Sequence, residues 1–351
     1  MLKKVQQIFR IIVLCIVFFT TTVVGTFGVL WVKGKNEFVK ELNDIGILKT
    51  EDIVKEKEDV INEENYILYQ GERYKFNDQI ISILCIGVDK ERFSEGQTVI
   101  GQAGQADTLI LLVLDRKTKQ ITFINISRDS MTDIEIYNVK NEYVDTRQGQ
   151  ICLSYAYGDG REESCIRTVN AVSRLLFGIP IHGYIAINLS AVEEMNDLVG
   201  GVELEILEDI PNTDLYQGQT VNLTGEQARA YVKWRNYKGE DAGPEANEYR
   251  MKRQRQYMES FLKKVIERGK ENPFFLLEVF EQVSENIVTN INGAKLSYLA
   301  PLAISCNIDQ FKMIKVPGKI TEENNYACYY VDDRALYELL LKVFYEKTIE
   351  F

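Results

Sequence analysis

The sequence predicts an α/β fold in which a mixed central sheet is sandwiched between helices, with one N-terminal transmembrane helix before it. Two continuous apolar runs, "IISILCIG" and "TLILLVL", are typical of short strands covered on both faces. A third run, "ITFINIS", follows the polar turn "DRKTKQ", which indicates a hairpin. Helical patterns alternate with strands further along the chain, and this alternation favours a layered domain.

Start and stop signals mark the expected helices. Residues 161–178 carry apolar side chains at helical spacing and finish with a glycine. After the strand "GYIAINL", Ser190 and Glu193 have the spacing of a capping box and Gly200 is placed to end the helix. The strand "VELEIL" comes next, so we expect a β-α-β unit here. A second capping box is predicted at Thr224, before "GEQARAYVKW".

The N-terminal region has the pattern of a membrane anchor. Residues 11–32 contain no charged side chain, and these 22 positions can cross a hydrocarbon core of about 30 Å as a helix. Lysines and an arginine within residues 1–10 place that end in the cytoplasm and the rest of the chain outside the cell membrane. A cleaved signal peptide is the alternative. Residues 33–78 are rich in charge and predict a solvated, partly helical stalk, followed by one extracytoplasmic domain over residues 79–351.

Composition excludes some classes of function. The 351-residue chain has a net charge of -11, which argues against a sequence-independent nucleic-acid binder because such proteins need a basic face. With 6 cysteines, a single histidine and no CxxC spacing, a structural zinc site is not expected. Disulfides are permitted outside the membrane, and a bond between Cys306 and Cys328 is a reasonable pairing. The single histidine, His182, is expected to be structural.

Acidic and basic residues mark the ends of the three apolar strands. If these strands are antiparallel neighbours, the chain leaves the sheet at Asp89, re-enters after Asp107 and leaves again at Arg128 and Asp129, all at one edge. Carboxylate oxygens are ligands that Mg²⁺ accepts together with water and phosphates. The alternative for each aspartate is an ordinary polar residue at a strand end.

Further cations come from "YVKWRNY" and "NEYRMKRQRQYMESFLKKVIE". In the second segment an apolar helical stripe begins at Tyr257, and steps of four and three residues back from it place Arg253 and Arg250 on the same side. Cations in the first turn of a helix oppose its macrodipole by about 0.3 to 1 kcal/mol each, so their clustering there favours a bound anion such as phosphate. Lys252 and Arg255 should point to solvent.

An ordered series of motifs carries a family resemblance: "CIGVDK", "ADTLILLVLDRKTKQITFINISRDS", "LSYAYGDG", "LFGIPIHGYIAINLSAVEEMNDLVGGVELEI", "LTGEQARAYVKWRN", "YRMKRQRQ" and "VPG". Between residues 80 and 335 the chain resembles the LytR-CpsA-Psr family. The resemblance implies a membrane-anchored, Mg²⁺-dependent phosphotransferase. Such an enzyme moves a glycopolymer, of the teichoic acid or capsular polysaccharide type, from a polyprenyl-pyrophosphate carrier to peptidoglycan. The implied partners are this lipid-linked glycan, the peptidoglycan acceptor and membrane lipid, with no nucleic acid.

The resemblance also implies roles for individual residues. Asp89 and Asp107 would bind the metal, and Asp107, Arg128 and Asp129 would be catalytic. The pyrophosphate would be bound by Arg128, Lys233, Arg235, Arg250, Arg253 and Gln105.

The chain departs from the family pattern at several of these positions. Gln105 replaces a common arginine, Gln150 a common lysine, Cys152 a common asparagine, and Lys233 a frequent arginine. Two further functions stay open, the second of which the changes at Gln105 and Gln150 make conceivable. One is a polyprenyl-pyrophosphate phosphatase that uses water as the acceptor, and the other is a non-catalytic lipid-pyrophosphate receptor with a regulatory role.

Overall fold

The computed structural model describes residues 25–38, 40, 60–63, 66–93, 100–235, 245–272, 274–307, 311–323 and 326–348. Within these ranges no helix is both long and apolar enough to cross a bilayer. Of the expected membrane span, residues 11–24 lie outside the described part of the chain, whereas residues 25–32 begin a helix that continues to residue 38.

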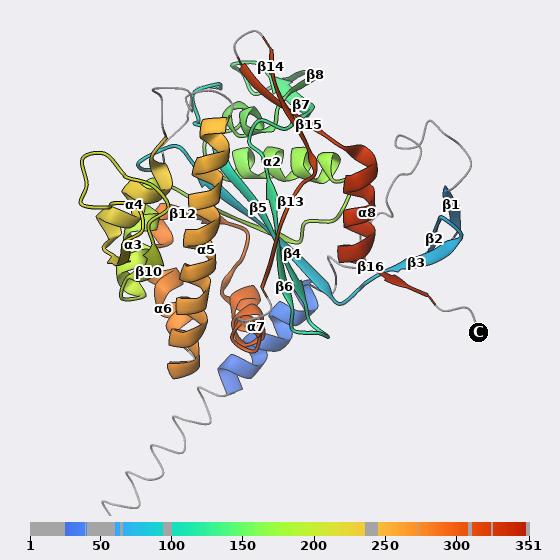
Figure 1. Ribbon diagram of the computed structural model, residues 1–351. Coiled ribbons are helices and arrows are strands. Elements are labelled where there is room, and N and C mark those ends of the chain that lie inside the picture. Colours follow the sequence, from blue (N-terminus) through green and yellow to red (C-terminus); the bar gives the residue numbers. More distant parts are fainter. Residues whose placement is uncertain are drawn as a thin grey trace, which may run out of the picture.

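A six-stranded mixed sheet forms the centre of the molecule (Figure 1). Its strands, in spatial order, are β12 (Ile287–Thr289), β9 (Gly183–Ile187), β4 (Ile80–Val88), β5 (Ala106–Asp115), β6 (Ile121–Ile126) and β13 (Lys312–Lys315). The three apolar runs, β4 to β6, are antiparallel neighbours, as the sequence predicted. Strand β9 is parallel to β4, and β13 is parallel to β6.

Helices cover both faces of the sheet, which confirms the expected layered α/β fold. Helices α2 (Glu162–Leu175) and α8 (Asp333–Phe344) pack on one face, and α5 (Glu245–Glu271) and α7 (Gly293–Ile304) pack on the other.

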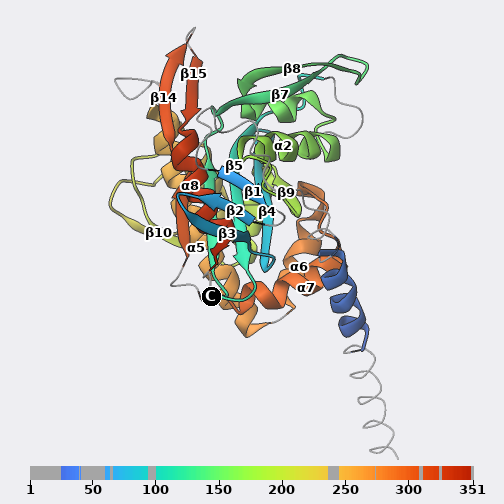
Figure 2. The ribbon, with the colours of Figure 1, turned by 90° about the vertical axis from the view of Figure 1, so that its right-hand side faces the viewer.

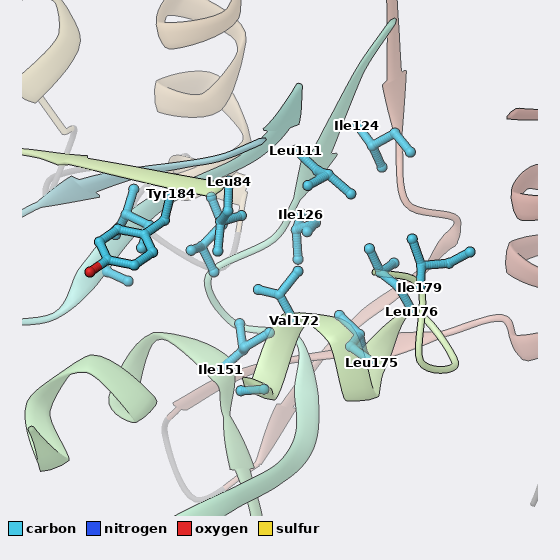
Figure 3. Close-up of a cluster of buried hydrophobic side chains, with 14 of the residues drawn as sticks. Leu84, Leu111, Ile124, Ile126, Ile151, Val172, Leu175, Leu176, Ile179 and Tyr184 are labelled. Atoms are coloured by element: carbon cyan, nitrogen blue, oxygen red, sulfur yellow. The ribbon is translucent and has the colours of Figure 1, made fainter. Parts of the chain in front are cut away.

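Alternate residues of each central strand enter the two cores. Leu84 of β4 belongs to the cluster formed with α2 and α8, whereas its neighbour Ile83 belongs to the cluster formed with α7. Figure 3 shows Val172 of α2 facing Ile126 of β6 in the first of these cores. Val172, Leu175 and Leu176 of the helix predicted over 161–178 are therefore core residues, whereas Ile166 is exposed.

A lateral unit lies beside the central sheet. Strand β10 (Val202–Glu205) pairs with β11 (Thr220–Leu223) in a separate two-stranded sheet. It packs with α3 (Leu189–Leu198) and α4 (Gly225–Lys233). The expected β-α-β unit is therefore wrong in one respect, since β10 is not part of the central sheet. Its side chains pack against α4 and α5 instead.

Helix caps were predicted correctly at one of the two sites. The box at Thr224 is present, with the Thr224 side chain and the Gln227 side chain each accepting a backbone N–H. Helix α3 begins two positions earlier than expected, because the N-cap is Asn188, whose side chain accepts from the backbone N–H of Ala191 at 2.9 Å. Ser190 is thus inside the helix, where its hydroxyl donates to the carbonyl of Glu91 at 2.7 Å.

The helix over residues 25–38 packs against α7. Phe38 is 1% exposed, and the ring of Trp31 meets that of Tyr298 edge-on at 5.5 Å. A Cβ at Gly34 would collide with the backbone of Ala294, so only a glycine permits this close approach of the two helices.

Residues 60–63 and 66–76 also belong to the folded part of the chain. They form β1 (Val60–Glu63), β2 (Tyr66–Tyr69) and β3 (Glu72–Phe76), which pair with β16 (Tyr345–Lys347) in a four-stranded sheet. Ile67 is 1% exposed and joins the core formed with α2 and α8. The folded region therefore begins before residue 79, and the predicted boundary between stalk and domain is corrected accordingly.

Two hairpins project from the end of the molecule opposite α7 (Figures 1 and 2). One consists of β7 (Met131–Tyr137) and β8 (Tyr143–Gln150), and the other of β14 (Gly318–Glu323) and β15 (Tyr326–Val331). The remaining elements are η2 (Ile151–Tyr157), α6 (Phe275–Gln282) and η4 (Ser284–Asn286).

The proposed disulfide between Cys306 and Cys328 is wrong. Both residues are free thiols. Cys306 follows α7 and its thiol donates to the Leu302 carbonyl, whereas Cys328 lies in β15, one of the strands that project from the other end. Cys306 and Cys328 therefore lie at different ends of the molecule, and their sulfur atoms are not bonded to each other.

Candidate active site

The strand ends predicted to converge lie at one edge of the central sheet. Val88, the last residue of β4, is opposite Ala106, the first residue of β5. Leu109 of β5 is opposite Ile126, the last residue of β6. The chain therefore passes this edge three times, which confirms the register on which the site was built.

Asp107 is held between two arginines at this edge. Arg128 forms an ion pair with Asp107 Oδ1 through Nη1, and Arg250 Nη1 lies 2.7 Å from Asp107 Oδ2. The side chains of Asp107, Arg128 and Arg250 are 18%, 14% and 6% exposed. Asp107 Oδ1 is buried but makes no well-aligned hydrogen bond. Strands β5 and β6 and helix α5 thus place two cations on one partly satisfied carboxylate.

Two neutral side chains orient Arg128. Its Nη2 donates to Gln105 Oε1 and also to Cys152 Sγ, the latter at 3.4 Å. Burial raises the pKa of the Cys152 thiol to about 11, so the thiol is neutral at pH 7 and does not form an ion pair. The residues that replace the family's arginine and asparagine therefore remain in the site, where they position a cation.

Asp129 connects the site to both hairpins. Its Oδ1 lies 3.5 Å from Arg128 Nε and accepts from Gln150 Nε2 at 3.2 Å. The same amide group donates to the carbonyl of Ala327 at 2.7 Å, and Tyr329 N donates to the carbonyl of Asp129 at 2.8 Å. Gln150 has no charge to offer phosphate, and its amide fixes the position of Asp129 instead.

Asp89 is the most accessible acidic residue of the predicted set. It is exposed, and its Oδ1 accepts from Gln105 N at 2.6 Å. Among the described residues no group of three or more His, Cys, Asp or Glu side chains could hold a metal. Mg²⁺, however, is commonly held by one or two carboxylates together with substrate phosphates and water. The accessible Asp89 and the incompletely bonded Asp107 Oδ1 fit that mode of binding.

Arg253 lies apart from the Asp107 cluster. It is 1% exposed and forms an ion pair with Glu208. Its Nε donates to the carbonyl of Tyr231 at 2.9 Å, and its Nη2 donates to the carbonyl of Trp234. Burial is the main cause that lowers the pKa of Arg253 from its ordinary value. These contacts make Arg253 a structural support for the end of α4 and the residues that follow it, which include Lys233 and Arg235.

The remaining predicted cations differ in exposure. Lys233 is about half exposed, and its Nζ lies 3.0 Å from Glu91, which holds the pKa of that carboxyl below its usual range. Arg235 is partly buried beside Trp234 at the end of the segment. Lys252 is exposed as expected, whereas Arg255 is partly buried.

The reasoning from the first turn of α5 is wrong. The helix begins at Glu245, more than one turn before Arg250, so neither predicted arginine lies where the helix dipole acts most strongly. The shared face of Arg250, Arg253 and Tyr257 is confirmed, since all three are buried. Their clustering reflects packing and pairing with carboxylates.

His182 has a structural role, as expected. It is 4% exposed, and its Nδ1 accepts from Ser82 N at 2.9 Å. Burial lowers its pKa to about 4, so the imidazole is neutral at pH 7. Its partner Ser82 is in the first half of β4, whereas the site lies beyond the end of that strand.

Sequence reasoning missed Lys315, Glu248 and Glu208. Lys315 Nζ lies 3.0 Å from Glu248 Oε1 and 5.2 Å from the centroid of the Tyr329 ring. The position of Lys315 depends on the pairing of β13 with β6, which joins segments almost two hundred residues apart. The signal available in the sequence was the position of Lys315 just before the quoted "VPG" motif.

Comparisons with known proteins agree with the resemblance. The LytR_cpsA_psr family model matches residues 42–343. A polyisoprenyl-teichoic acid–peptidoglycan teichoic acid transferase, TagU, from Enterococcus faecalis is 26% identical over 226 residues, 64% of this chain and 66% of that protein. The TagU of Bacillus mycoides is 26% identical over 267 residues, 75% of this chain and 77% of the relative.

Solved structures share the fold. The structure of TagV from Bacillus subtilis has a TM-score of 0.57 and 21% sequence identity, and the match covers 75% of this chain and 95% of that one. Protein gbs0355 from Streptococcus agalactiae has a TM-score of 0.60 and 22% identity, with 76% and 86% of the two chains covered.

Proposed function

Because the chain belongs to the LytR-CpsA-Psr family, we propose that it is a phosphotransferase that moves a glycopolymer from a polyprenyl-pyrophosphate carrier to peptidoglycan. The glycopolymer would be of the teichoic acid or capsular polysaccharide type. The names of the TagU relatives describe transfer of teichoic acid between a polyisoprenyl carrier and peptidoglycan. We also propose that residues 11–32 anchor the chain in the cell membrane, with residues 1–10 in the cytoplasm and the folded part outside.

The observation that carries the proposal is the pairing of Asp107 with both Arg128 and Arg250. Phosphoryl transfer requires mainly that the phosphates be positioned and their developing charge neutralised. Guanidinium groups present planar pairs of donors that match phosphate oxygens. Here two such groups point at one carboxylate, so a phosphate can replace that carboxylate as their partner without leaving a buried cation unpaired.

The carboxylates would have a separate task. Asp107 and Asp89 would hold Mg²⁺, which when bound supplies positive charge to the pyrophosphate oxygens. Arg128 would remain oriented by Gln105 and Cys152 while its outer donors bind phosphate. Arg250 would bind from the α5 side, and Arg253 would hold the segment of Lys233 and Arg235 in place.

The pyrophosphate would thus bind to arginine side chains that are already held in position before it arrives. Electrostatic stabilisation of this kind is often the largest contribution to catalysis, because fixed donors need no reorganisation during the reaction. The hydroxyl of a peptidoglycan sugar would attack the phosphorus atom next to the glycan and release polyprenyl phosphate.

A reconstituted transfer assay tests the proposal. The full chain in detergent is incubated with a polyprenyl-pyrophosphate-linked glycan and a muropeptide acceptor, with and without Mg²⁺, and the phosphorus-containing products are separated. We expect a glycan–phosphate–muropeptide product that requires Mg²⁺ and is lost in Asp107→Asn and Arg128→Met. Lys312→Met, a change at an exposed lysine at the other end of β13, is the matched control and should retain the product.

The neutral Gln105 and Gln150 favour one alternative, a lipid-pyrophosphate receptor without turnover. That function would give binding of the lipid-linked glycan but no product, even with an acceptor that a related transferase uses. Release of free glycan phosphate from wild type without muropeptide adduct would instead identify a phosphatase. Either result would refute the proposed transfer.

A further inference from the structure

Lys315 lies at the same sheet edge as Arg128. Strand β13 is parallel to β6, and its last residue, Lys315, is opposite Asn125. Arg128 follows Asn125 by three positions, just after β6 ends. Parallel neighbours finish at a common edge, so Lys315 is brought to the edge where Asp107 and Arg128 meet.

Lys315 contacts one residue of α5 and one residue that binds the site. Its Nζ lies 3.0 Å from Glu248 Oε1, and Glu248 precedes Arg250 by two positions in α5. On the other side Nζ lies over the ring of Tyr329 at 5.2 Å, and the backbone N–H of Tyr329 binds the carbonyl of Asp129. Lys315 therefore lies between α5 and the β14–β15 hairpin, at the sheet edge that also carries Asp107 and Arg128.

The Lys315–Glu248 pair differs from the buried pairs of the site. The side chains of Lys315 and Glu248 are 35% and 44% exposed, whereas those of Arg250 and Arg253 are 6% and 1% exposed. An ion pair open to water contributes little to stability. It can therefore exchange partners at small cost, and an ammonium group has three donors to offer a second anion.

We propose that Lys315 is a phosphate-binding residue of this site, and that Glu248 is its partner until an anionic substrate displaces that carboxylate. The inference rests on the proposed function and adds a ligand for the pyrophosphate. It places a cation at an edge where Gln105 and Gln150 carry none. Glu248 competes with the substrate for Lys315, so its removal should help binding.

Opposite effects of two variants distinguish this role from a structural one. Inorganic pyrophosphate is titrated by calorimetry into the full chain in detergent with Mg²⁺. We expect Lys315→Met to weaken binding by about tenfold to a hundredfold, the range for loss of one charge-assisted hydrogen bond. Glu248→Gln should bind pyrophosphate more tightly than wild type. Lys312→Met, at the other end of the same strand, should bind as wild type does.

Other outcomes separate this inference from the proposed function. If Arg128→Met loses binding while Lys315→Met binds as tightly as wild type, Lys315 is not a ligand, but the proposed function stands. If Lys315→Met and Glu248→Gln both weaken binding, the pair is structural and the inference fails. If wild type does not bind pyrophosphate with or without Mg²⁺, both the inference and the proposed function are overturned.

Discussion

Arg253 provides the sharpest test of how the site is built. The sequence placed it among the pyrophosphate ligands, but the structure pairs it with Glu208 and with the backbone carbonyls of Tyr231 and Trp234. We predict that Arg253→Ala destabilises the folded chain directly, and that it affects substrate binding by releasing the segment that follows α4.

The size of this effect follows from its contacts. Each hydrogen bond from a charged donor to a buried carbonyl contributes about 1.5 to 3 kcal/mol. Glu208 is 27% exposed, so water can replace Arg253 as its partner and that loss adds less. Two carbonyl bonds therefore predict a loss of about 3 to 6 kcal/mol in the free energy of unfolding, which overlaps the range of about 3 to 5 kcal/mol for removal of one member of a buried pair.

Denaturant unfolding of the full chain in detergent measures this loss. Trp234 accepts from Arg253 and is one of only 2 tryptophans, so fluorescence reports on the same segment. Lys252→Ala, an exposed neighbour in α5, is the control and should change the free energy by less than about 0.5 kcal/mol. The reasoning is refuted if Arg253→Ala unfolds as wild type does but no longer binds pyrophosphate, because Arg253 would then be a direct ligand.

Three further predictions concern stability, each measured by unfolding in denaturant or heat. Asp107→Asn leaves Arg128 and Arg250 without their shared anion and should lower the free energy of unfolding by about 3 kcal/mol; added pyrophosphate should then stabilise this variant more than wild type, and an equal gain would contradict the pairing. His182 has a folded-state pKa of about 4, below the ordinary 6.5, so wild-type stability should be complete above pH 6.5 and fall by about 3 kcal/mol as the pH drops to 4. His182→Gln should remove this pH dependence, and its persistence would assign it to other groups. Thr224→Ala deletes a capping box and should cost about 1 kcal/mol, whereas an unchanged midpoint would show that the cap is energetically neutral.

Local patterns predicted much of the sheet and its edge. The apolar runs of β4 to β6 are short and continuous, and the polar turn between β5 and β6 allows only a tight connection. Once these strands are antiparallel, the positions of Asp89, Asp107 and Arg128 at one edge follow from geometry alone. Helical periodicity likewise sufficed to place Arg250 and Arg253 on one face.

The errors concern contacts between distant segments. Nothing near Arg253 in the sequence indicates that its partner is Glu208, which is 45 residues away. The strand pattern of β10 likewise does not show whether that strand joins the central sheet or a separate one. Strands β2 and β3 were not predicted because charged residues flank β2 and occupy the exposed positions of β3, so residues 60–76 have the composition of a solvated segment. Partner choice in such cases is decided by tertiary packing.

The packing of residues 25–38 against α7 fixes how far the candidate active site lies from the proposed membrane anchor. Phe38 packs in the same cluster as Ile81, near the start of β4, whereas Asp89 follows the end of that strand. Eight residues of extended chain separate these two points, about 25 Å at the rise of a β-strand. With the anchor proposed above, β4 would act as a rigid spacer between the bilayer and the candidate active site. Under the proposed function, the carrier's pyrophosphate would have to rise from the lipid surface to reach the site, and the polymer would be joined to peptidoglycan at a distance from the membrane set by the length of β4.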